Sequence, residues 1–298
     1  MTFPELILKY EIAIRLSFFI GIFILMALWE VKAPRRELSV SKLLRWSNNL
    51  GLVVLNSLLL RLVFPIAAVG VAAYCATNGW GVLHLYEIPL WIAIIIAVVV
   101  MDLVIYLQHV LVHAVPTLWR LHRVHHADLD YDVTTGARFH PLEIIFSMLI
   151  KFSVIIVLGA PVVAVIIFEV ILNGMAMFNH GNVGLSPRLD KFLRYFIVTP
   201  DMHRVHHSTE DNEANSNFGF NLSIWDRLFG TYIDQPRKGH VGMEIGIHRY
   251  RDANQVAKLP GMLLLPFKGK ISGYAINRRE WRNESTERTG KTSKEDGN

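Results

Sequence analysis

The apolar positions of this chain gather into long runs, and five of these runs dominate its first 180 residues. A bilayer span needs about 20 apolar residues. The runs that reach or approach this length are Ile12–Trp29, Leu50–Ala76, Leu90–Leu107, Ile144–Leu158 and Val162–Phe178. The fourth run is short and is separated from the fifth by 159–161, so these two could form a hairpin within the bilayer. The pattern predicts an all-α, multi-pass transmembrane helical bundle of four to five segments.

Basic residues between the runs predict how the bundle is oriented. The loop after the first run contains Lys32, Arg35, Arg36, Lys42 and Arg45, whereas Thr77–Pro89 contains no Lys or Arg. Cytoplasmic loops carry an excess of Lys and Arg, so the first loop, and everything that follows His180, is expected to be cytoplasmic. We therefore expect an integral membrane protein of a bacterial inner membrane or the endoplasmic reticulum, with a cytoplasmic, histidine-rich helical cap.

The change of pattern along the chain suggests three parts. Residues 1–89 would form N-terminal transmembrane helices and loops, 90–235 a histidine-rich catalytic domain, and 236–298 a cytoplasmic C-terminal segment. From Lys268 onward the apolar pattern is lost. Asn283–Asn298 is polar, with Gly, Ser and Thr, and is expected to be disordered.

The composition supports a membrane protein and excludes several other classes. Hydrophobic residues make up 52% of the 298 positions and charged residues 18%, against about 25% charged residues in soluble domains. The single cysteine, Cys75, lies in an apolar run and cannot form an intramolecular disulfide. The net charge of +5 is spread thinly, which favours cytoplasmic loops over nucleic-acid binding. The thirteen histidines are the compositional anomaly.

Ten of the histidines lie between the end of the third run and residue 207, and most of them recur at helical spacings. His109 and His113 are four residues apart, and the pattern His-x-x-His-His occurs at His122–His126 and again at His203–His207. Residues i, i+3 and i+4 share one side of a helix, and neutral imidazole binds Zn, Cu, Fe and Ni. So many imidazoles suit two metal ions. The candidate ligands are His109, His113, His122, His125, His126, His140, His180, His203, His206 and His207.

These motifs resemble those of the fatty acid hydroxylase/sterol desaturase superfamily of integral membrane oxygenases. The resemblance covers about residues 90–235. The segments that carry it are His109–His113, His122–His126, Phe139–Glu143, Asn179–Gly181, His203–His207, Asn217–Gly219 and Trp225–Tyr232. The resemblance implies a non-heme di-iron oxidoreductase that uses O2 to hydroxylate or desaturate a lipid C–H bond. It also implies two histidine-bound Fe ions and a separate electron donor, such as a cytochrome b5-like protein, a ferredoxin or a reductase.

One position departs from the family pattern. Some members of the superfamily have a second histidine one turn from the equivalent of His180, whereas this chain has Ala176 and Gly184 at those places. His140 could supply the missing ligand, or one metal could have fewer ligands. The other interpretation of His140 is that it holds the turn at Pro141 through a hydrogen bond.

Polar residues inside the apolar runs are further candidates for the site. Asp102 shares a helical face with His109 and His113, and Glu169 and Asn173 share a face with His180. An acid within a span is costly and usually functional, and metal-bound histidines usually donate their second N–H to a carboxylate or carbonyl. We expect Asp102 to accept a hydrogen bond from a ligand histidine, and Glu169 and Asn173 to line the site. For Glu169, a buried hydrogen bond between helices is an equally weighted alternative.

The remaining acids and aromatic residues give weaker expectations. Asp128, Asp130 and Asp132 follow the second histidine motif and are interpreted as an exposed acidic loop rather than as acceptors for imidazoles. Asp201 is open to either interpretation. Trp225–Tyr232 is expected to pack the cap against the bundle rather than to take part in catalysis.

Three other classes of function fit the sequence less well than a lipid oxygenase does. A zinc hydrolase would use a His-Glu-x-x-His helix, which is absent, and a heme protein would need paired histidines deep in two spans. A metal-binding or transport protein without oxygen chemistry should distribute its histidines across the bilayer, but nearly all of them fall on one predicted side. Zn2+ binds nitrogen ligands more tightly than Fe2+, so purified protein could contain zinc.

Overall fold

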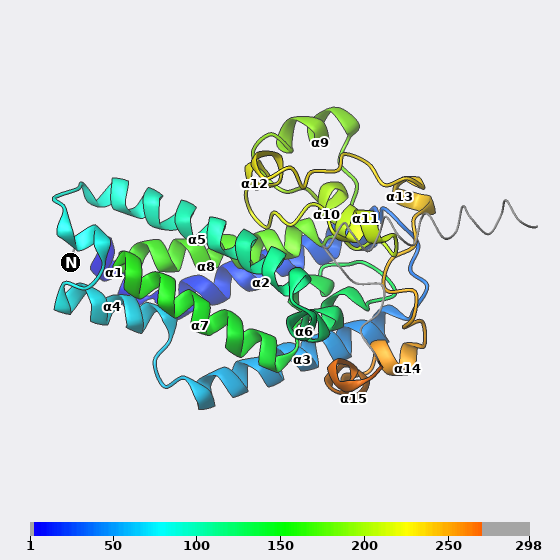
Figure 1. Cartoon of the computed structure of the whole chain (residues 1–298), viewed down its shortest axis with the longest axis horizontal. Coiled ribbons are helices and arrows are strands. Elements are labelled where there is room, and N and C mark those ends of the chain that lie inside the picture. The colour runs from blue at the N-terminus through cyan, green and yellow to red at the C-terminus, as the bar shows by residue number, and fades with distance from the viewer. Residues whose placement is uncertain (1–2, 270–298) are drawn as a thin grey trace, which may run out of the picture.

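The structure, a computed structural model, describes residues 3–269, and its regular elements are helices. The polar tail 283–298, expected to be disordered, lies outside the described residues. The chain begins with a short helix and then runs back and forth through a bundle of long ones (Figure 1). These are α1 (Phe3–Lys9), α2 (Glu11–Lys32), α3 (Lys42–Val63), α4 (Ala68–Asn78), α5 (Leu90–Ala114), α7 (Pro141–Leu158) and α8 (Val162–Asn179).

Five segments of the bundle are long and apolar enough to cross a membrane: Glu11–Lys32, Lys42–Leu85, Leu90–Ala114, Pro141–Leu158 and Val162–Asn179. Their outer surfaces carry large exposed aliphatic side chains, such as Ile12 and Leu62. Exposed apolar surface of this extent is unusual for a soluble monomer and normal against lipid. The multi-pass, all-helical fold predicted from the sequence is confirmed.

The second predicted span needs a correction, because Leu50–Ala76 is not one helix. The helix α3 ends at Val63, and α4 begins at Ala68. Pro65 lies between them; it has no N–H to donate, and its ring disfavours a helical conformation at Phe64. The helix α4 therefore continues the span along a path that is displaced from the axis of α3 (Figure 1).

Shorter helices form a cap at one end of the bundle (Figure 1). Several have Pro at their first turn and a hydroxyl cap: Ser186 accepts from Leu189 N, and Thr199 accepts from Met202 N. They are α6 (Pro116–His126), η2 (Thr135–Ala137), α9 (Pro187–Leu193), α10 (Pro200–His206), α11 (Asp211–Ala214), α12 (Ile224–Leu228), α13 (Gly239–Gly242), α14 (Ala253–Val256), α15 (Leu259–Leu264) and η3 (Leu265–Phe267). The turn η1 (Val82–Leu85) lies at the opposite end.

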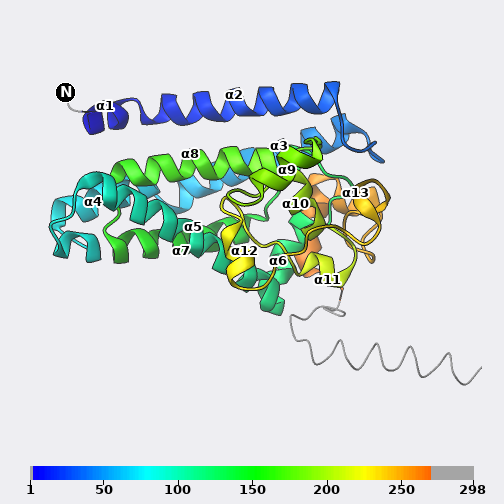
Figure 2. The same ribbon diagram turned by 90° about the horizontal axis from the view of Figure 1, so that it is seen from above.

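Small side chains hold the centre of the bundle together. Ala72, Ala97 and Ala164 are fully buried in one cluster, which joins α4, α5, α7 and α8. Small residues let membrane helices approach closely, where packing replaces the hydrophobic driving force. The helix α2 packs along α8 on one flank (Figure 2).

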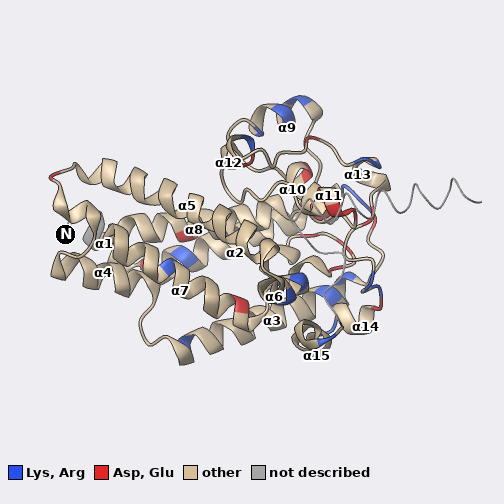
Figure 3. Ribbon diagram, viewed as in Figure 1, with Lys and Arg blue, Asp and Glu red and all other residues tan. Residues whose placement is uncertain are grey.

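Charged residues are unevenly distributed along the bundle axis. Lys, Arg, Asp and Glu concentrate in the cap, whereas the long helices are mostly uncharged (Figure 3). The cap end is also where α5 ends and where α7 begins. All of the candidate ligand histidines belong to this end.

The prediction of an exposed loop at Asp128, Asp130 and Asp132 is wrong, because all three side chains are buried. Asp128 accepts two hydrogen bonds from Arg45, at 2.8 and 2.9 Å, and Asp132 pairs with the same guanidinium. Asp130 accepts from the backbone N–H groups of Ser39 and Val40, each at 2.8 Å. The loop is acidic because it binds the segment that joins α2 to α3.

Replacing Arg45 by Met should destabilise the protein strongly. The substitution leaves Asp128 and Asp132 buried without their shared cation, and breaking a buried ion pair in this way costs about 3–5 kcal/mol. Thermal unfolding in detergent, followed by circular dichroism, measures the effect. Arg61→Met on the exposed surface of α3 is the control. An equal melting temperature for the two variants would contradict this account of the loop.

Candidate metal centre

Nine histidines meet at the cap end of the bundle in two groups. The ligand atoms within each group lie within 4.8 Å of one another, and all nine side chains are buried. The first group comprises His109, His113, His122, His126 and His206. The second comprises His125, His180, His203 and His207. Each group draws on at least three separate segments of the chain, and α6 and α10 contribute to both.

Hydrogen bonds orient the rings of the first group. Nδ1 of His109 donates to the carbonyl oxygen of Phe218 at 2.8 Å, and Nδ1 of His206 donates to that of Ser216 at 2.7 Å. Nδ1 of His122 contacts a carboxylate oxygen of Glu143 at 2.6 Å. With the proton on Nδ1, each ring directs the lone pair of Nε2 inward. The Nε2 atoms of these three histidines are buried and have no hydrogen-bond partner.

The second group has the same character. Nδ1 of His180 donates to the carbonyl oxygen of Ala176 at 2.8 Å, which leaves its Nε2 as an acceptor. That Nε2 faces Nε2 of His203 at 3.1 Å and Nε2 of His125 at 3.2 Å. Three ring nitrogens that converge on one point suit a shared cation. Both ring nitrogens of His207 are buried without a hydrogen-bond partner.

The imidazoles are held in the neutral form that binds metals. Burial, together with a smaller effect of the neighbouring imidazoles, lowers the pKa of His206 and of His180 to about 3. Burial and the same crowding also lower the pKa of His125, His126 and His207 well below the usual range. At neutral pH the rings therefore present lone pairs rather than positive charge. The donor set is all nitrogen and fits Fe, Zn, Cu or Ni.

His140 lies outside both groups. Its side chain caps α7: Nδ1 accepts from Leu142 N at 3.2 Å, and Nε2 contacts the carbonyl oxygen of Leu263 at 3.3 Å. This is the alternative in which His140 holds the turn at Pro141. At one position of the family's extra histidine this chain has Ala176, and the backbone of Ala176 packs against η2. A Cβ added to Gly136 would lie 2.4 Å from the Ala176 carbonyl oxygen, so η2 approaches α8 too closely for a side chain at position 136.

Sequence reasoning missed several groups that orient the ligands. Glu143 belongs to the motif Phe139–Glu143, but the sequence assigned it no role. The carbonyl groups of Ser216 and Phe218 belong to the backbone, so the side chains at these positions do not reveal them. The motif Asn217–Gly219 contains one relevant signal, Asn217, which adopts a left-handed φ of 49°. Its side chain donates to the carbonyl oxygens of Met202 and Ile233 and fixes the loop between the two carbonyl groups.

The hydrogen bond expected from a ligand histidine to Asp102 is not formed. Oδ2 of Asp102 accepts instead from Trp225 Nε1 at 2.8 Å and from Leu222 N at 3.2 Å. The carboxylate therefore fastens the segment before α12 to α5. Asp201 is also away from the histidine groups; it pairs with Arg204 and, at 3.1 Å, with Arg35.

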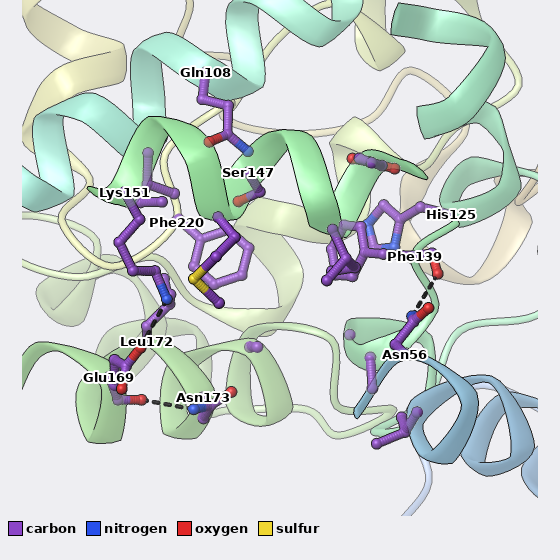
Figure 4. A pocket seen from close by; sticks show the side chains of 18 of the residues that line it. Asn56, Gln108, His125, Phe139, Ser147, Lys151, Glu169, Leu172, Asn173 and Phe220 are labelled. Carbon is purple, nitrogen blue, oxygen red and sulfur yellow. Dashed lines mark hydrogen bonds and ion pairs between the residues drawn. The ribbon is translucent and has the colours of Figure 1, made fainter. Parts of the chain in front are cut away.

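Glu169 and Asn173 line a cavity of about 380 Å³ that starts at the histidines. His109, His122 and His125 form part of its wall at the cap end. Towards the other end, Glu169 pairs with Lys151 at 2.9 Å and with Arg15 at 3.1 Å. Figure 4 shows this ion pair on one side of the cavity and His125 with Phe139 on the other.

Apolar side chains supply much of the rest of the cavity wall. They come from five of the long helices, α2, α3, α5, α7 and α8, and include Val53, Leu60, Ile105, Met148 and Leu172. The cavity therefore joins a metal-binding end to an apolar interior between the long helices.

Comparison with known proteins agrees with the histidine site that the structure contains. Residues 94–231 match the model of the fatty acid hydroxylase family. This segment is similar to a fatty acid hydroxylase domain. It contains all nine histidines of the two groups. No solved structure matches the chain.

Relatives of the fatty acid hydroxylase domain include several lipid-modifying enzymes. The chain is 31% identical over 159 residues to the ornithine lipid hydroxylase OlsE of Rhizobium tropici, covering 53% of this chain and 46% of that one. It is 30% identical over 145 residues to the alkylglycerol monooxygenase of Xenopus tropicalis, covering 49% and 31%. The human alkylglycerol monooxygenase is 28% identical over 145 residues, covering 49% and 32%. The chain thus spans less than half the length of these relatives.

Replacing Glu143 by Gln should weaken metal binding without unfolding the protein. The amide keeps the shape but loses the charge that steadies Nδ1–H of His122, and loss of such a partner typically costs about 10–100-fold in metal affinity. Metal titration of the purified protein measures the change. Glu87→Gln, an exposed acid near the opposite end, is the control. Equal affinity in both variants would remove Glu143 from the centre.

His140→Ala and His125→Ala should differ in metal content. His140 contacts backbone groups of α7 and α15 and the ring of Phe267, whereas His125 lies in the second group. We expect His140→Ala to retain the metal content of the unmodified protein and His125→Ala to contain less metal. Elemental analysis of the purified variants decides this, and loss of metal in His140→Ala would restore His140 as a ligand.

Proposed function

We propose that this chain is a membrane-bound, O2-dependent oxidoreductase that hydroxylates or desaturates a C–H bond of a lipid. The observation that carries the proposal is the position of the two histidine groups at one end of an intramembrane cavity. His109 and His122 of the first group and His125 of the second share its wall. A lipid chain in the cavity would therefore meet both groups.

Each histidine group would hold one iron ion. The unpartnered, inward-facing ring nitrogens fit such ions, and the absence of thiolates and carboxylates from both groups gives an all-imidazole donor set. Bound non-heme iron supplies oxygen activation, which zinc cannot supply because it has no redox chemistry. The role of the chain is to fix the ligand geometry and to keep bulk water away from the reacting carbon.

The surroundings of the cavity support these two roles. The ring of Phe139 stacks on that of His125 with centroids 4.5 Å apart, which covers one face of a ligand. The apolar walls hold a hydrocarbon chain and exclude water. At the other end, the ion pair of Glu169 with Lys151 would position a polar part of the substrate, as would Asn173. These residues would affect how the substrate binds and which of its carbons lies next to the histidines, rather than the reacting bond itself.

The orientation of the protein and its electron supply follow from the cap. Because Lys and Arg concentrate at the histidine end (Figure 3), we place this end on the cytoplasmic side. A lipid can then keep its chain in the bilayer while a separate, cytoplasmic electron donor approaches the cap. The names of the relatives, an ornithine lipid hydroxylase and alkylglycerol monooxygenases, support a polar lipid as the substrate.

Turnover should depend on both histidine groups. We expect His125→Ala, in the second group, and His206→Ala, in the first, each to abolish product formation while the protein still inserts into membranes. Lipid extracts from cells grown under 18O2 are compared by mass spectrometry for a labelled hydroxyl group or a new double bond. Activity of the zinc-loaded protein without O2 or a reductant would contradict the proposal and favour a hydrolase.

A bulky side chain in the middle of the cavity should block the substrate but spare the metals. Ser147 lines the cavity one turn from Glu143, and Trp at this position would fill the path of a lipid chain. We expect Ser147→Trp to lose most of its turnover and to keep its metal content. Leu149→Trp on the exposed surface of the same helix is the matched control. Full turnover in Ser147→Trp would show that the substrate does not occupy this cavity.

A further inference from the structure

Two neighbouring segments of the cap carry a concentrated apolar surface. We call residues 187–196 and 222–229, which include α9 and α12, the α9–α12 lobe. Seven of its large hydrophobic side chains are 45–67% exposed. They are Leu189, Phe192, Tyr195, Phe196, Ile224, Leu228 and Phe229. Leu189 and Phe192 lie three residues apart on one face of α9, and the ring of Phe196, in the turn after this helix, lies 5.6 Å from that of Phe192.

Contacts with α5 fix the depth of this lobe. Trp225 donates to Asp102, the ring of Phe229 stacks on Tyr106 at 5.3 Å, and the hydroxyls of Tyr106 and Thr231 are 2.9 Å apart. Asp102 and Tyr106 lie well inside the candidate span Leu90–Ala114. The lobe therefore lies beside a membrane-spanning helix and not beyond its end. Figure 1 shows α12 in the part of the cap that lies next to α5.

Helix lengths place these contacts relative to the bilayer. The helices α7 and α8 have 18 residues each, which corresponds to about 27 Å, close to the ~30 Å thickness of the hydrocarbon core. The far ends of α5 and α7 lie at the same end of the bundle (Figure 1). The same thickness measured along α5 from Leu90 reaches roughly residue 108. Asp102 and Tyr106 thus fall within the hydrocarbon core or at its edge, and the side chains that cover them face lipid.

The charges of the lobe fit the polar zone of a membrane. Its two acids, Asp190 and Asp226, are buried, while Arg188, Lys191 and Arg227 are exposed. The guanidinium group of Arg227 lies over the rings of Tyr195, at 5.4 Å, and of Tyr232, at 4.0 Å. Tyr beside Lys and Arg is typical of the boundary between acyl chains and headgroups. Exposed Lys and Arg also attract anionic lipids.

We propose that the α9–α12 lobe is immersed in the bilayer on the histidine side, with its apolar side chains among the acyl chains and its basic residues at the headgroup phosphates. Only part of the chain after His180 would then be in water, in contrast to the expectation from the sequence. The occupant of this surface is the bilayer itself, because the surface continues the lipid-facing side of α5. The proposal rests on the membrane-spanning helices and is independent of the metal chemistry.

Single spin labels test the proposal directly. Cys75, the only cysteine, is replaced by Ala, and cysteine is introduced at Phe192 or at Leu228. The full-length labelled protein is placed in nanodiscs of phosphatidylcholine and phosphatidylglycerol, without any electron donor. Collisions with O2, which enters lipid, are compared with collisions with a water-soluble nickel chelate. We expect both labels to favour O2 several-fold, as does a label at Ile95 on the exposed surface of α5.

A label at Lys238 in the cap provides the aqueous control, because this side chain is 47% exposed. If the labels at Phe192 and Leu228 match Lys238, the lobe faces water and the proposal is wrong; the surface would then be free for a protein partner. Dipolar broadening that grows with the protein-to-lipid ratio would also overturn it, in favour of contact between two copies of the chain. Unchanged circular dichroism shows that each labelled protein is folded.

Discussion

Nine neutral imidazoles buried side by side are the constraint on which the rest of the structure depends. Neutral rings avoid the cost of burying charge, but each ring still needs a partner for its N–H group. The chain provides such partners outside the groups, as in the carbonyl of Ala176 for His180 and the carboxylate of Glu143 for His122. The inner nitrogens are left to a metal. Because the partners come from distant segments, the bundle and the cap can assemble the site only together.

Most of the fold and the histidines of the two groups could be predicted because both depend on residue type at regular spacing. Long apolar runs and the i, i+3, i+4 recurrence of histidine are local patterns, and they located the helices and the nine residues of the two groups. The pattern could not show that Pro65 divides a span, since the runs on both sides remain apolar. It also could not locate the partners of the rings, because a carbonyl group is present at every residue and only the folded chain selects those of Ser216 and Phe218.

The acids show where local interpretation fails. Asp128 and Asp132 look like an exposed loop by composition, but their charge is matched by Arg45, which is 83 and 87 residues away. Asp102 shares a helical face with two ligand histidines and still pairs with Trp225, because its position along α5 lies deeper than the histidines. In each case the partner lies far away in the sequence. A carboxylate is therefore poor evidence for a metal site until its partner is known.

A single peptide segment links the membrane surface to the histidines. The carbonyl oxygen of Phe218 accepts from His109, while the N–H groups of Phe218 and Gly219 donate to the buried carboxylate of Asp226 in α12. The position of α12 beside α5 therefore sets the position of a group that orients a ring of the first histidine group. Gly219 permits this arrangement, since an added Cβ would lie 2.5 Å from Asp226 Oδ2. If the lobe lies in the lipid, the bilayer itself supports the element that orients His109.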